Sequence, residues 1–281
     1  MRKAHEVERE SQLRRWVIGP VGRAFNANAW TVPKHPWRGF SSQVVMITVA
    51  GLAYFGARMV TKGADSLAFS NAQDLIAFER SLGIYVERTA QQLVLDNRAI
   101  VTFFNWVYIW FHWPVVLGSF FFLYRNAKGT FVLYRNAIFV SGAIGLIIFI
   151  TYPVAPPRFL DGFTDTVAEL STSYKFWQPP SIVNKYAALP SFHVGWNLLA
   201  GVMLFHATKT RAIRVFAVMS PALMTAAVVF TANHYIIDAI VGVAIAMVGL
   251  GGAVMIRRYT SRLDLTPPPP TPDAIPVSTS A

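Results

Sequence analysis

The sequence has 281 residues, of which 54% are hydrophobic and only 14% are charged, and its mean hydropathy is +0.41. Because a soluble domain usually carries about 25% charged residues, this deficit excludes most soluble folds and indicates a multi-pass membrane protein. The basic residues behind the net charge of +11 lie in segments separated by apolar runs of membrane length, which argues against nucleic acid as a partner. The absence of cysteine excludes disulfides and thiolate metal sites.

The chain order predicts an all-α fold in three parts. Residues 1–42 are polar and basic and form a cytoplasmic leader, residues 43–260 form a membrane domain, and residues 261–281 are a Pro-rich, disordered cytoplasmic tail. Residues 64–98 have apolar side chains at helical spacing, which predicts one or two interfacial amphipathic helices. The apolar runs predict a bundle of six transmembrane helices, at about 44–60, 100–124, 137–152, 191–207, 213–232 and 235–256.

The placement of Lys and Arg predicts the orientation of these spans. Basic residues gather in the leader and in every second connection, and the remaining connections are balanced in charge. By the positive-inside rule both termini are then cytoplasmic. Three polar residues, Arg158, His193 and His234, fall at the opposite, extracytoplasmic ends of the spans. We expect the protein to lie in the plasma membrane.

Three short motifs at these ends carry the candidate chemistry. In the first, prolines end a span and leave Arg158 at the membrane edge, where a guanidinium suits two oxygens of a phosphate. The second reads Pro-Ser-Phe-His, in which Ser191 is a typical helix-start residue with His193 close behind it. The third is His-Tyr-Ile-Ile-Asp, which sets Asp238 one helical turn beyond His234.

The last motif predicts a hydrogen-bonded pair, in which the carboxylate of Asp238 fixes the tautomer of His234. Farther along the same helical face, Gly242 and Ala246 are small, which permits close packing against a neighbouring helix. Ionisable groups at membrane depth cost roughly 2.5–3.5 kcal/mol, so they indicate function rather than packing. We therefore expect a membrane enzyme with paired histidines.

These three motifs, in this order and spacing, resemble those of the type-2 phosphatidic acid phosphatase superfamily over residues 64–249. The stretches PVAPPR, NKYAALPSFHVGW and TANHYIID are most similar to its inositolphosphotransferase branch, which includes inositol phosphorylceramide synthases. The resemblance implies a phosphohistidine mechanism without a metal or other cofactor. It implies that His234 is the nucleophile, that Asp238 orients it, that His193 is the general acid and base, and that Arg158 and Ser191 bind the phosphoryl oxygens.

The chain departs from the superfamily pattern at two places. The lysine that usually precedes the motif arginine by seven residues is replaced by Thr151, and a Ser-Arg pair before the last histidine is replaced by Ala227 and Val228. With fewer cationic ligands, the site fits a phosphodiester, with one negative charge, better than a monoester with nearly two. This favours transfer of a phosphorylated head group from a phospholipid to an alcohol or polyol acceptor over hydrolysis of a lipid phosphate.

Two further classes remain open from sequence, a lipid transporter that uses the same polar cluster and a metal-dependent hydrolase that uses the histidines as ligands. Other polar residues have simpler interpretations. We expect Asn105, Tyr108 and His112 to form buried hydrogen bonds, with His112 far from the outer edge. The remaining polar residues near the site are expected to be solvated, namely Glu79, Glu87, Asp161, Asp165, Lys185 and Tyr186.

Overall fold

The computed structural model describes residues 63–170 and 185–263, together with part of the segment between residues 45 and 59. The regular secondary structure of the described residues is helical, and an isolated bridge joins Val154 and Ala187. The predicted leader and the Pro-rich tail beyond Leu263 lie outside the described residues, and the predicted first span at 44–60 is described only in part. An all-α membrane protein is therefore confirmed for the described part of the chain.

The count of membrane spans differs from the prediction. Four helical stretches in the described ranges are long and apolar enough to cross a bilayer: Arg98–Asn126, Lys128–Thr151, Arg211–Phe230 and Ile236–Thr260. The predicted span at 191–207 is a helix of only 16 residues, α11 (Phe192–Ala207). At 1.5 Å per residue it is about 24 Å long, short of the roughly 30 Å of hydrocarbon that a span crosses. The prediction of six spans is corrected to these four.

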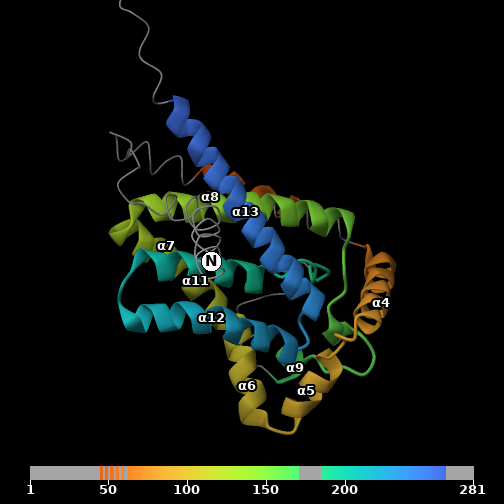
Figure 1. Ribbon diagram of the computed structural model, residues 1–281. Coiled ribbons are helices and arrows are strands. Elements are labelled where there is room, and N and C mark those ends of the chain that lie inside the picture. The colour runs from red at the N-terminus through yellow and green to blue at the C-terminus, as the bar shows by residue number, and fades with distance from the viewer. Residues whose placement is uncertain are drawn as a thin grey trace, which may run out of the picture.

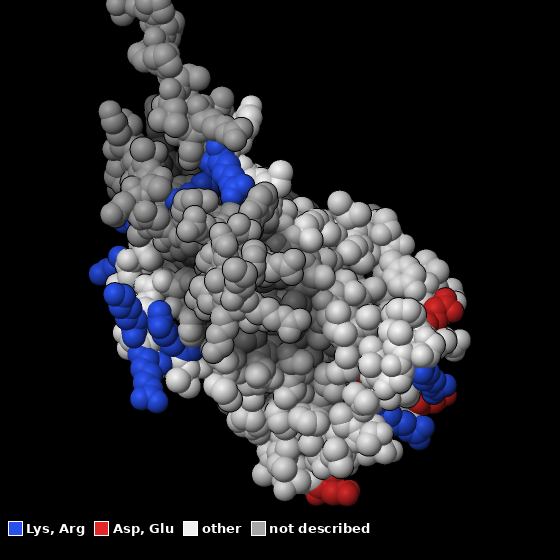
Figure 2. All heavy atoms as spheres, viewed as in Figure 1, with Lys and Arg blue, Asp and Glu red and all other residues white. Residues whose placement is uncertain are grey.

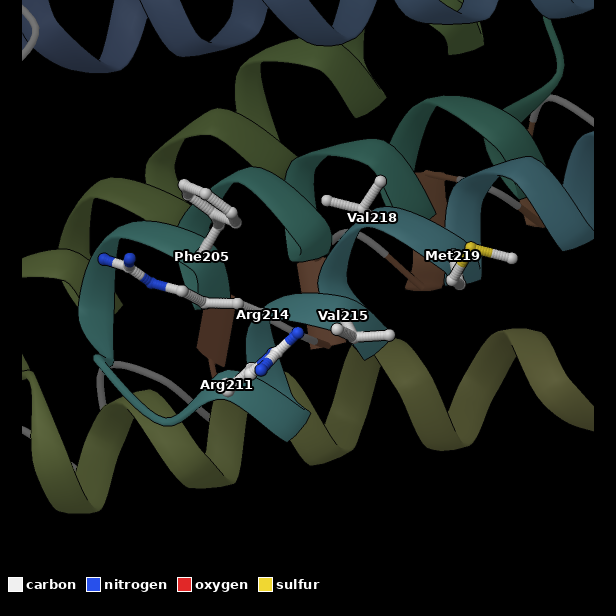
Figure 3. Close-up of a pocket in the computed structure, with 6 residues that line it drawn as sticks. All are labelled: Phe205, Arg211, Arg214, Val215, Val218 and Met219. Atoms are coloured by element: carbon white, nitrogen blue, oxygen red, sulfur yellow. The ribbon is translucent and has the colours of Figure 1, made fainter.

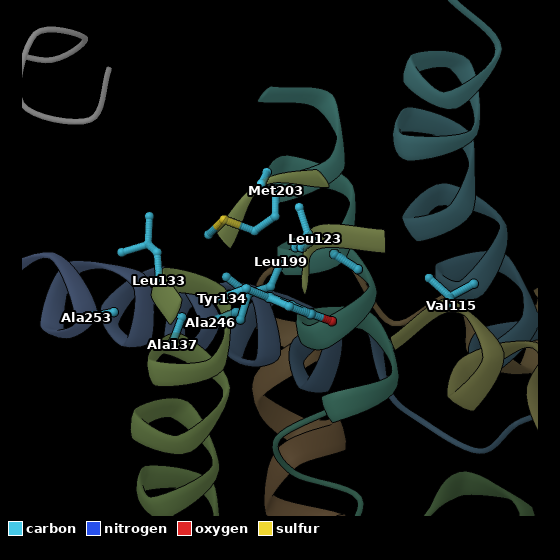
Figure 4. Packing of buried hydrophobic residues seen from close by; sticks show 11 residues of the cluster. Val115, Leu123, Leu133, Tyr134, Ala137, Leu199, Met203, Ala246 and Ala253 are labelled. Carbon is cyan, nitrogen blue, oxygen red and sulfur yellow. The ribbon is translucent and has the colours of Figure 1, made fainter. Parts of the chain in front are cut away.

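The helices of the bundle pack around α11, which lies between α12 (Arg211–Phe230) and α13 (Ile236–Leu263) (Figure 1). The long helix α8 (Lys128–Thr151) packs along α13, and α7 (His112–Asn126) covers another side of α11. The core between these helices is a cluster of fully buried apolar side chains (Figure 4). It includes Leu123, Leu133, Tyr134, Leu199 and Met203.

Small residues set the distance between α11 and α13. A Cβ added at Gly195 would lie 2.5 Å from the carbonyl oxygen of Gly242, and one added at Gly242 would collide with the backbone of Ser191. Ala246 also faces Gly195. The prediction that Gly242 and Ala246 allow close packing is thus confirmed, and the close approach brings the starts of the two helices together.

The first transmembrane helical stretch is not a regular α-helix. It consists of α6 (Arg98–Trp106), a π-helical turn at Val107–Phe111, and α7. A π-turn inserts one residue into the helical repeat and rotates the residues that follow, and such turns often occur at functional sites. Here Asn97 caps the start of α6 by accepting hydrogen bonds from the amides of Ala99 and Ile100.

The predicted amphipathic region folds as two helices, α4 (Asp65–Ser81) and α5 (Glu87–Leu95). Together with the short helix α9 (Thr166–Leu170), they gather at the end of the bundle where α13 begins (Figure 1). Figure 2 shows most of the visible Lys and Arg at the opposite side, whereas Asp and Glu appear near this end, together with further basic side chains. The motif residues lie at the end that α4 and α5 cover.

Candidate active site

The structure brings the three sequence motifs to one place. Arg158 lies in a 3-10 turn, Pro157–Phe159, that follows α8, and its backbone N–H donates to the carbonyl of Ala232 at 2.8 Å. His193 is the second residue of α11, and His234 lies in the turn between α12 and α13. The ring centroids of the two histidines are 5.8 Å apart. Segments more than 70 residues apart in sequence thus meet at the same end of the bundle.

The tautomer of His234 follows from its hydrogen bonds. Its Nδ1 lies 2.8 Å from the carbonyl oxygen of Ala188 and 3.3 Å from Oδ2 of Asp238. A carbonyl oxygen can only accept, so Nδ1 must carry the hydrogen. In the neutral ring the lone pair is then on Nε2, which is the atom available to attack phosphorus. The predicted pairing of His234 with Asp238 is present, and the carbonyl of Ala188 holds the same N–H independently.

Burial keeps His234 neutral. Its side chain is almost wholly buried, and this desolvation lowers the pKa to about 3, although the hydrogen bond to Ala188 acts in the opposite direction. The positive charge of Arg158 lowers the pKa further, which indicates that the guanidinium lies near the ring. At neutral pH the imidazole is therefore unprotonated on Nε2 and suited to nucleophilic attack.

Asp238 is itself held rigidly. It has no exposed surface, and Oδ2 also accepts the backbone N–H of Tyr235 at 2.9 Å. Its backbone carbonyl accepts the N–H of Ser191 at 3.0 Å, which ties the start of α11 to the first turn of α13. Ser191 is the N-cap of α11, and its Oγ lies 3.5 Å from the N–H of Val194. The predicted helix-cap geometry of Ser191 is therefore present, at a fully buried position.

Arg158 forms an ion pair with Asp165. Its Nε lies 3.4 Å from Oδ2 of Asp165, and Oδ1 of the same aspartate accepts the N–H of Ala168 at the start of α9. Asp165 is thus a structural partner rather than only a solvated loop residue. Because a phosphate would offer more oxygens than one carboxylate, Arg158 could exchange this partner for an anionic ligand.

The positions at which the superfamily usually carries further cations are unsuited to anion binding here. Thr151 is exposed at the end of α8, and its hydroxyl donates to the carbonyl of Ile147 in its own helix. Ala227 and Val228 have no exposed surface and belong to an apolar cluster between α12 and the π-turn. Arg158 is therefore the motif cation near the two histidines.

Three polar side chains surround His193: Tyr108 and His112, which were expected only to form buried hydrogen bonds, and Asn197. The ring of Tyr108 stacks on it at 4.7 Å, and the ring of His112 lies 4.5 Å away. Asn197 contacts His112 Nδ1 at 2.9 Å and donates to the carbonyl of His193 at 2.7 Å. The prediction that His112 lies far from the outer histidines is wrong. Spacing along the helix of His112 does not reveal at what depth in the bundle α11, which carries His193, begins. Asn105 does form the expected buried hydrogen bonds, with Thr166.

The prediction of a solvated face for Glu79 and Glu87 is also wrong. Neither has any exposed surface. Glu87 Oε1 accepts the N–H of Ile236 at 2.7 Å, and Glu79 Oε1 accepts that of Ile237 at 2.8 Å. These amides belong to the first turn of α13, which directly follows His234. Helical periodicity assigned both residues to a polar face, and only the docking of α4 and α5 against α13 turned that face inward.

A surface pocket lies at the other end of the bundle. It has a volume of about 330 Å³ and is lined by Phe205, Val215, Val218, Met219 and two arginines, Arg211 and Arg214 (Figure 3). Phe205 lies near the end of α11 and the other lining residues lie in the first half of α12, whereas His234 follows the end of α12. The pocket is therefore separate from the histidine cluster.

Metal ligation was a third possibility for the histidines. Within residues 63–170 and 185–263, no group of three or more His, Asp or Glu side chains is arranged to hold a metal ion. The nearest acidic side chain to His234 is Asp238, which binds its Nδ1–H rather than a free lone pair.

The fold and the site define a helical membrane protein with two histidines and an arginine at one end of its bundle. A family model described as the PAP2 superfamily matches residues 73–251, which is more than half of the chain. The chain belongs to the PAP2 superfamily, whose members are phosphatases or phosphotransferases, and this membership supports an enzyme that acts on lipid phosphates. Neither a functionally curated protein nor a solved structure matches the chain.

Proposed function

We propose that this protein transfers a phosphorylated head group from a phospholipid to an alcohol or polyol acceptor through a phosphohistidine on His234. The observation that carries the proposal is the hydrogen bonding of His234, whose Nδ1–H is held by Ala188 and Asp238 and whose Nε2 keeps its lone pair. His193 lies beside it, with 5.8 Å between ring centroids, so a second imidazole is close to the proposed nucleophile.

In the first step Nε2 of His234 attacks phosphorus, the new N–P bond forms and the bond from phosphorus to the lipid alkoxide breaks. A protonated His193 gives its proton to the leaving alkoxide, a transfer worth about 10²–10⁴-fold in rate. The phosphorylated ring gains positive charge, which the carboxylate of Asp238 stabilises. In the second step His193 takes the proton of the acceptor hydroxyl, and the acceptor oxygen displaces His234 from phosphorus.

Arg158 and the start of α11 are the proposed binding site for the phosphoryl oxygens. The guanidinium offers two parallel donors, and the first amides of a helix capped by Ser191 form a partially positive end. The site has one motif arginine, and the other superfamily positions hold uncharged residues, namely Thr151, Ala227 and Val228. Such a site matches a substrate with one negative charge better than one with two. This supports a phosphodiester substrate, and we therefore propose an inositolphosphotransferase-like reaction rather than simple hydrolysis.

We place the site at the extracytoplasmic face of the plasma membrane, with both termini in the cytoplasm. The support is the distribution of charge: the ends of helices remote from the histidines carry Arg125, Lys128, Lys209, Arg211 and Arg257, as the positive-inside rule requires of a cytoplasmic side. The substrate would then approach sideways from the bilayer, with its head group directed towards Arg158.

A phosphatase reaction uses the same first step and differs only in the acceptor, which is water. It remains the second candidate because Arg158, His193 and His234 serve both reactions equally. A transporter is disfavoured for two reasons. The polar groups concentrate at one end of the bundle rather than along its depth, and they hold His234 in a single tautomer, although passage of a substrate requires no particular tautomer.

The test is incubation of the full-length protein in detergent micelles with labelled phosphatidylinositol or phosphatidic acid, with and without ceramide as an alcohol acceptor. We expect a new lipid product from phosphatidylinositol that depends on ceramide, and little phosphate release from phosphatidic acid. The His234→Ala variant should lose the product. Release of phosphate from phosphatidic acid without any transfer product would favour the phosphatase, and turnover that survives His234→Ala would refute both.

A further inference from the structure

Three consecutive backbone amides at the start of α13 each donate to a different carboxyl group. The N–H of Tyr235 binds Asp238 at 2.9 Å, that of Ile236 binds Glu87 at 2.7 Å, and that of Ile237 binds Glu79 at 2.8 Å. The first amides of a helix have no partner within the helix and form its positive end, so carboxyl groups are well matched to them. This turn immediately follows His234.

The two glutamates come from outside the membrane bundle. Glu79 lies in the last turns of α4, and Glu87 is the first residue of α5. They reach amides that are 158 and 149 residues away in sequence. Apolar residues of α4, namely Ala68, Ala72 and Leu75, share a buried cluster with Tyr235 and Ile237. The two carboxyl groups add hydrogen bonds to this apolar contact and so attach α4 and α5 to the helix that follows the proposed nucleophile.

The pair is arranged to share one proton. The second oxygens, Glu79 Oε2 and Glu87 Oε2, are buried and meet no N–H or O–H donor from the described part of the chain. The charge of Glu87 and a hydrogen bond with its side chain are among the causes that raise the pKa of Glu79, so the two carboxyl groups are neighbours. Two ionised carboxylates cannot bond, whereas one protonated and one ionised carboxyl group satisfy both second oxygens at once.

The surroundings of the pair explain where this proton resides. Burial, together with the negative charges of Glu87 and Asp238, raises the pKa of Glu79 to about 8. The charges of Glu79 and Glu87 also act on Tyr235, which neighbours Tyr85, and burial raises the pKa of Tyr235 above its ordinary value, so its phenol stays protonated. Among the described residues, no arginine or lysine is among the charges that act on Glu79, so the helix amides are its main positive partners.

We propose that Glu79 and Glu87 are positioning residues for the histidine site. Together they form a carboxyl pair that carries one proton. This pair holds the first turn of α13 in place, and with it His234 and Asp238. The inference rests on the proposed function, because it assigns His234 and Asp238 to the reaction. Loss of the shared proton places two adjacent anions in a buried space beside Asp238. Their repulsion loosens the turn and displaces His234 from its partner His193.

The test compares the full-length protein with three variants over about pH 6 to 10, using turnover of labelled phosphatidylinositol with ceramide. Glu79→Gln retains an oxygen for the amide of Ile237 and gains an N–H for Glu87, so it should keep near-normal turnover at pH 7. It should also lose the decline in kcat that the unchanged protein shows above about pH 8. Glu79→Leu should lower kcat by about 10²-fold with little change in KM, because Arg158 lies on another element.

Asp74→Asn is the matched control, because Asp74 lies on the same helix and is exposed. It should leave both turnover and its pH profile unchanged. An alkaline decline that persists in Glu79→Gln, or a Glu79→Leu variant with normal kcat, would overturn the inference. Glu79→Gln keeps the test decisive if Glu79→Leu does not fold.

A second measurement separates this inference from the proposed function, because it needs no turnover. A group whose pKa is raised on folding binds its proton more tightly in the native state, so stability falls as pH rises from its ordinary value towards the raised one. The melting temperature of the unchanged protein should therefore fall between about pH 5 and 8, and that of Glu79→Gln should fall less. Equal pH dependence in both would overturn the carboxyl pair, whatever the lipid assays give.

Discussion

Replacement of Asp238 by asparagine tests how His234 is held. The carboxylate lies 3.3 Å from Nδ1, and the carbonyl of Ala188 lies closer, at 2.8 Å. Asparagine removes the negative charge but leaves an oxygen able to accept the same N–H. Since Ala188 alone requires the hydrogen on Nδ1, the tautomer should survive the substitution. The expected loss is therefore the charge stabilisation of the phosphorylated ring alone.

The size of this loss can be estimated from the distance. At 3.3 Å and an effective dielectric constant of about 20, a full positive charge on the ring would interact with the carboxylate by about 5 kcal/mol. The asparagine oxygen retains a hydrogen bond to the charged ring of about 1.5–3 kcal/mol. The difference, about 2–3.5 kcal/mol, lowers kcat by about 30- to 400-fold. Reversal of the tautomer would instead cost about 10⁴-fold.

The assay is kcat for labelled phosphatidylinositol and ceramide, measured with equal amounts of folded, full-length protein, together with acid quenching to trap labelled phosphohistidine. Asp96→Asn, at an exposed position, is the control and should be normal. A loss near 10⁴-fold would mean that Asp238 rather than Ala188 sets the tautomer. A loss below about threefold would mean that the ring of His234 does not gain charge, which would refute its role as nucleophile.

Two further predictions concern packing and metal. Gly242→Ala places a methyl group against the backbone of Ser191, so α11 and α13 must separate. We therefore expect turnover to fall by about 10–100-fold. Gly251→Ala is the control, because Gly251 has open space around it, and its turnover should be normal in the same assay. Equal activity of the two alanine variants would contradict the role of the close helix approach. Treatment with EDTA should leave turnover unchanged, and activity that is lost with chelator and restored by added Zn²⁺ or Mg²⁺ would contradict the phosphohistidine mechanism.

Much of the site could be predicted from local sequence. The four-residue spacing of His234 and Asp238 places both on one helical face, whatever the rest of the chain does. Prolines before Arg158 and the serine before His193 mark the ends of helices through their own backbone chemistry. Charge alternation and apolar runs then assign these ends to the same side of a membrane. The structure brings the three together, as the sequence predicts.

Contacts made by distant segments could not be predicted. The carbonyl of Ala188 that holds His234 is a backbone atom, so no residue type at position 188 reveals it. Glu79 and Glu87 resemble a solvated helix face, because periodicity describes which residues share a face and not what that face meets. His112 was placed too far from His193 for a similar reason, since the π-turn and the short α11 set their relative depth.

The sequence by itself determined that the chain is a helical membrane protein, that it carries paired histidines and an arginine, and which residues form each local motif. These properties depend on composition and on spacing within single helices. Only the tertiary structure decided that four of the described helical stretches, in place of the six predicted spans, are long and apolar enough to cross a membrane. It also decided that Ala188 fixes the tautomer of His234 and that two buried glutamates hold the helix beside it. Those features depend on the packing of segments far apart in the chain, and hydrophobic periodicity carries no information about which segments will meet.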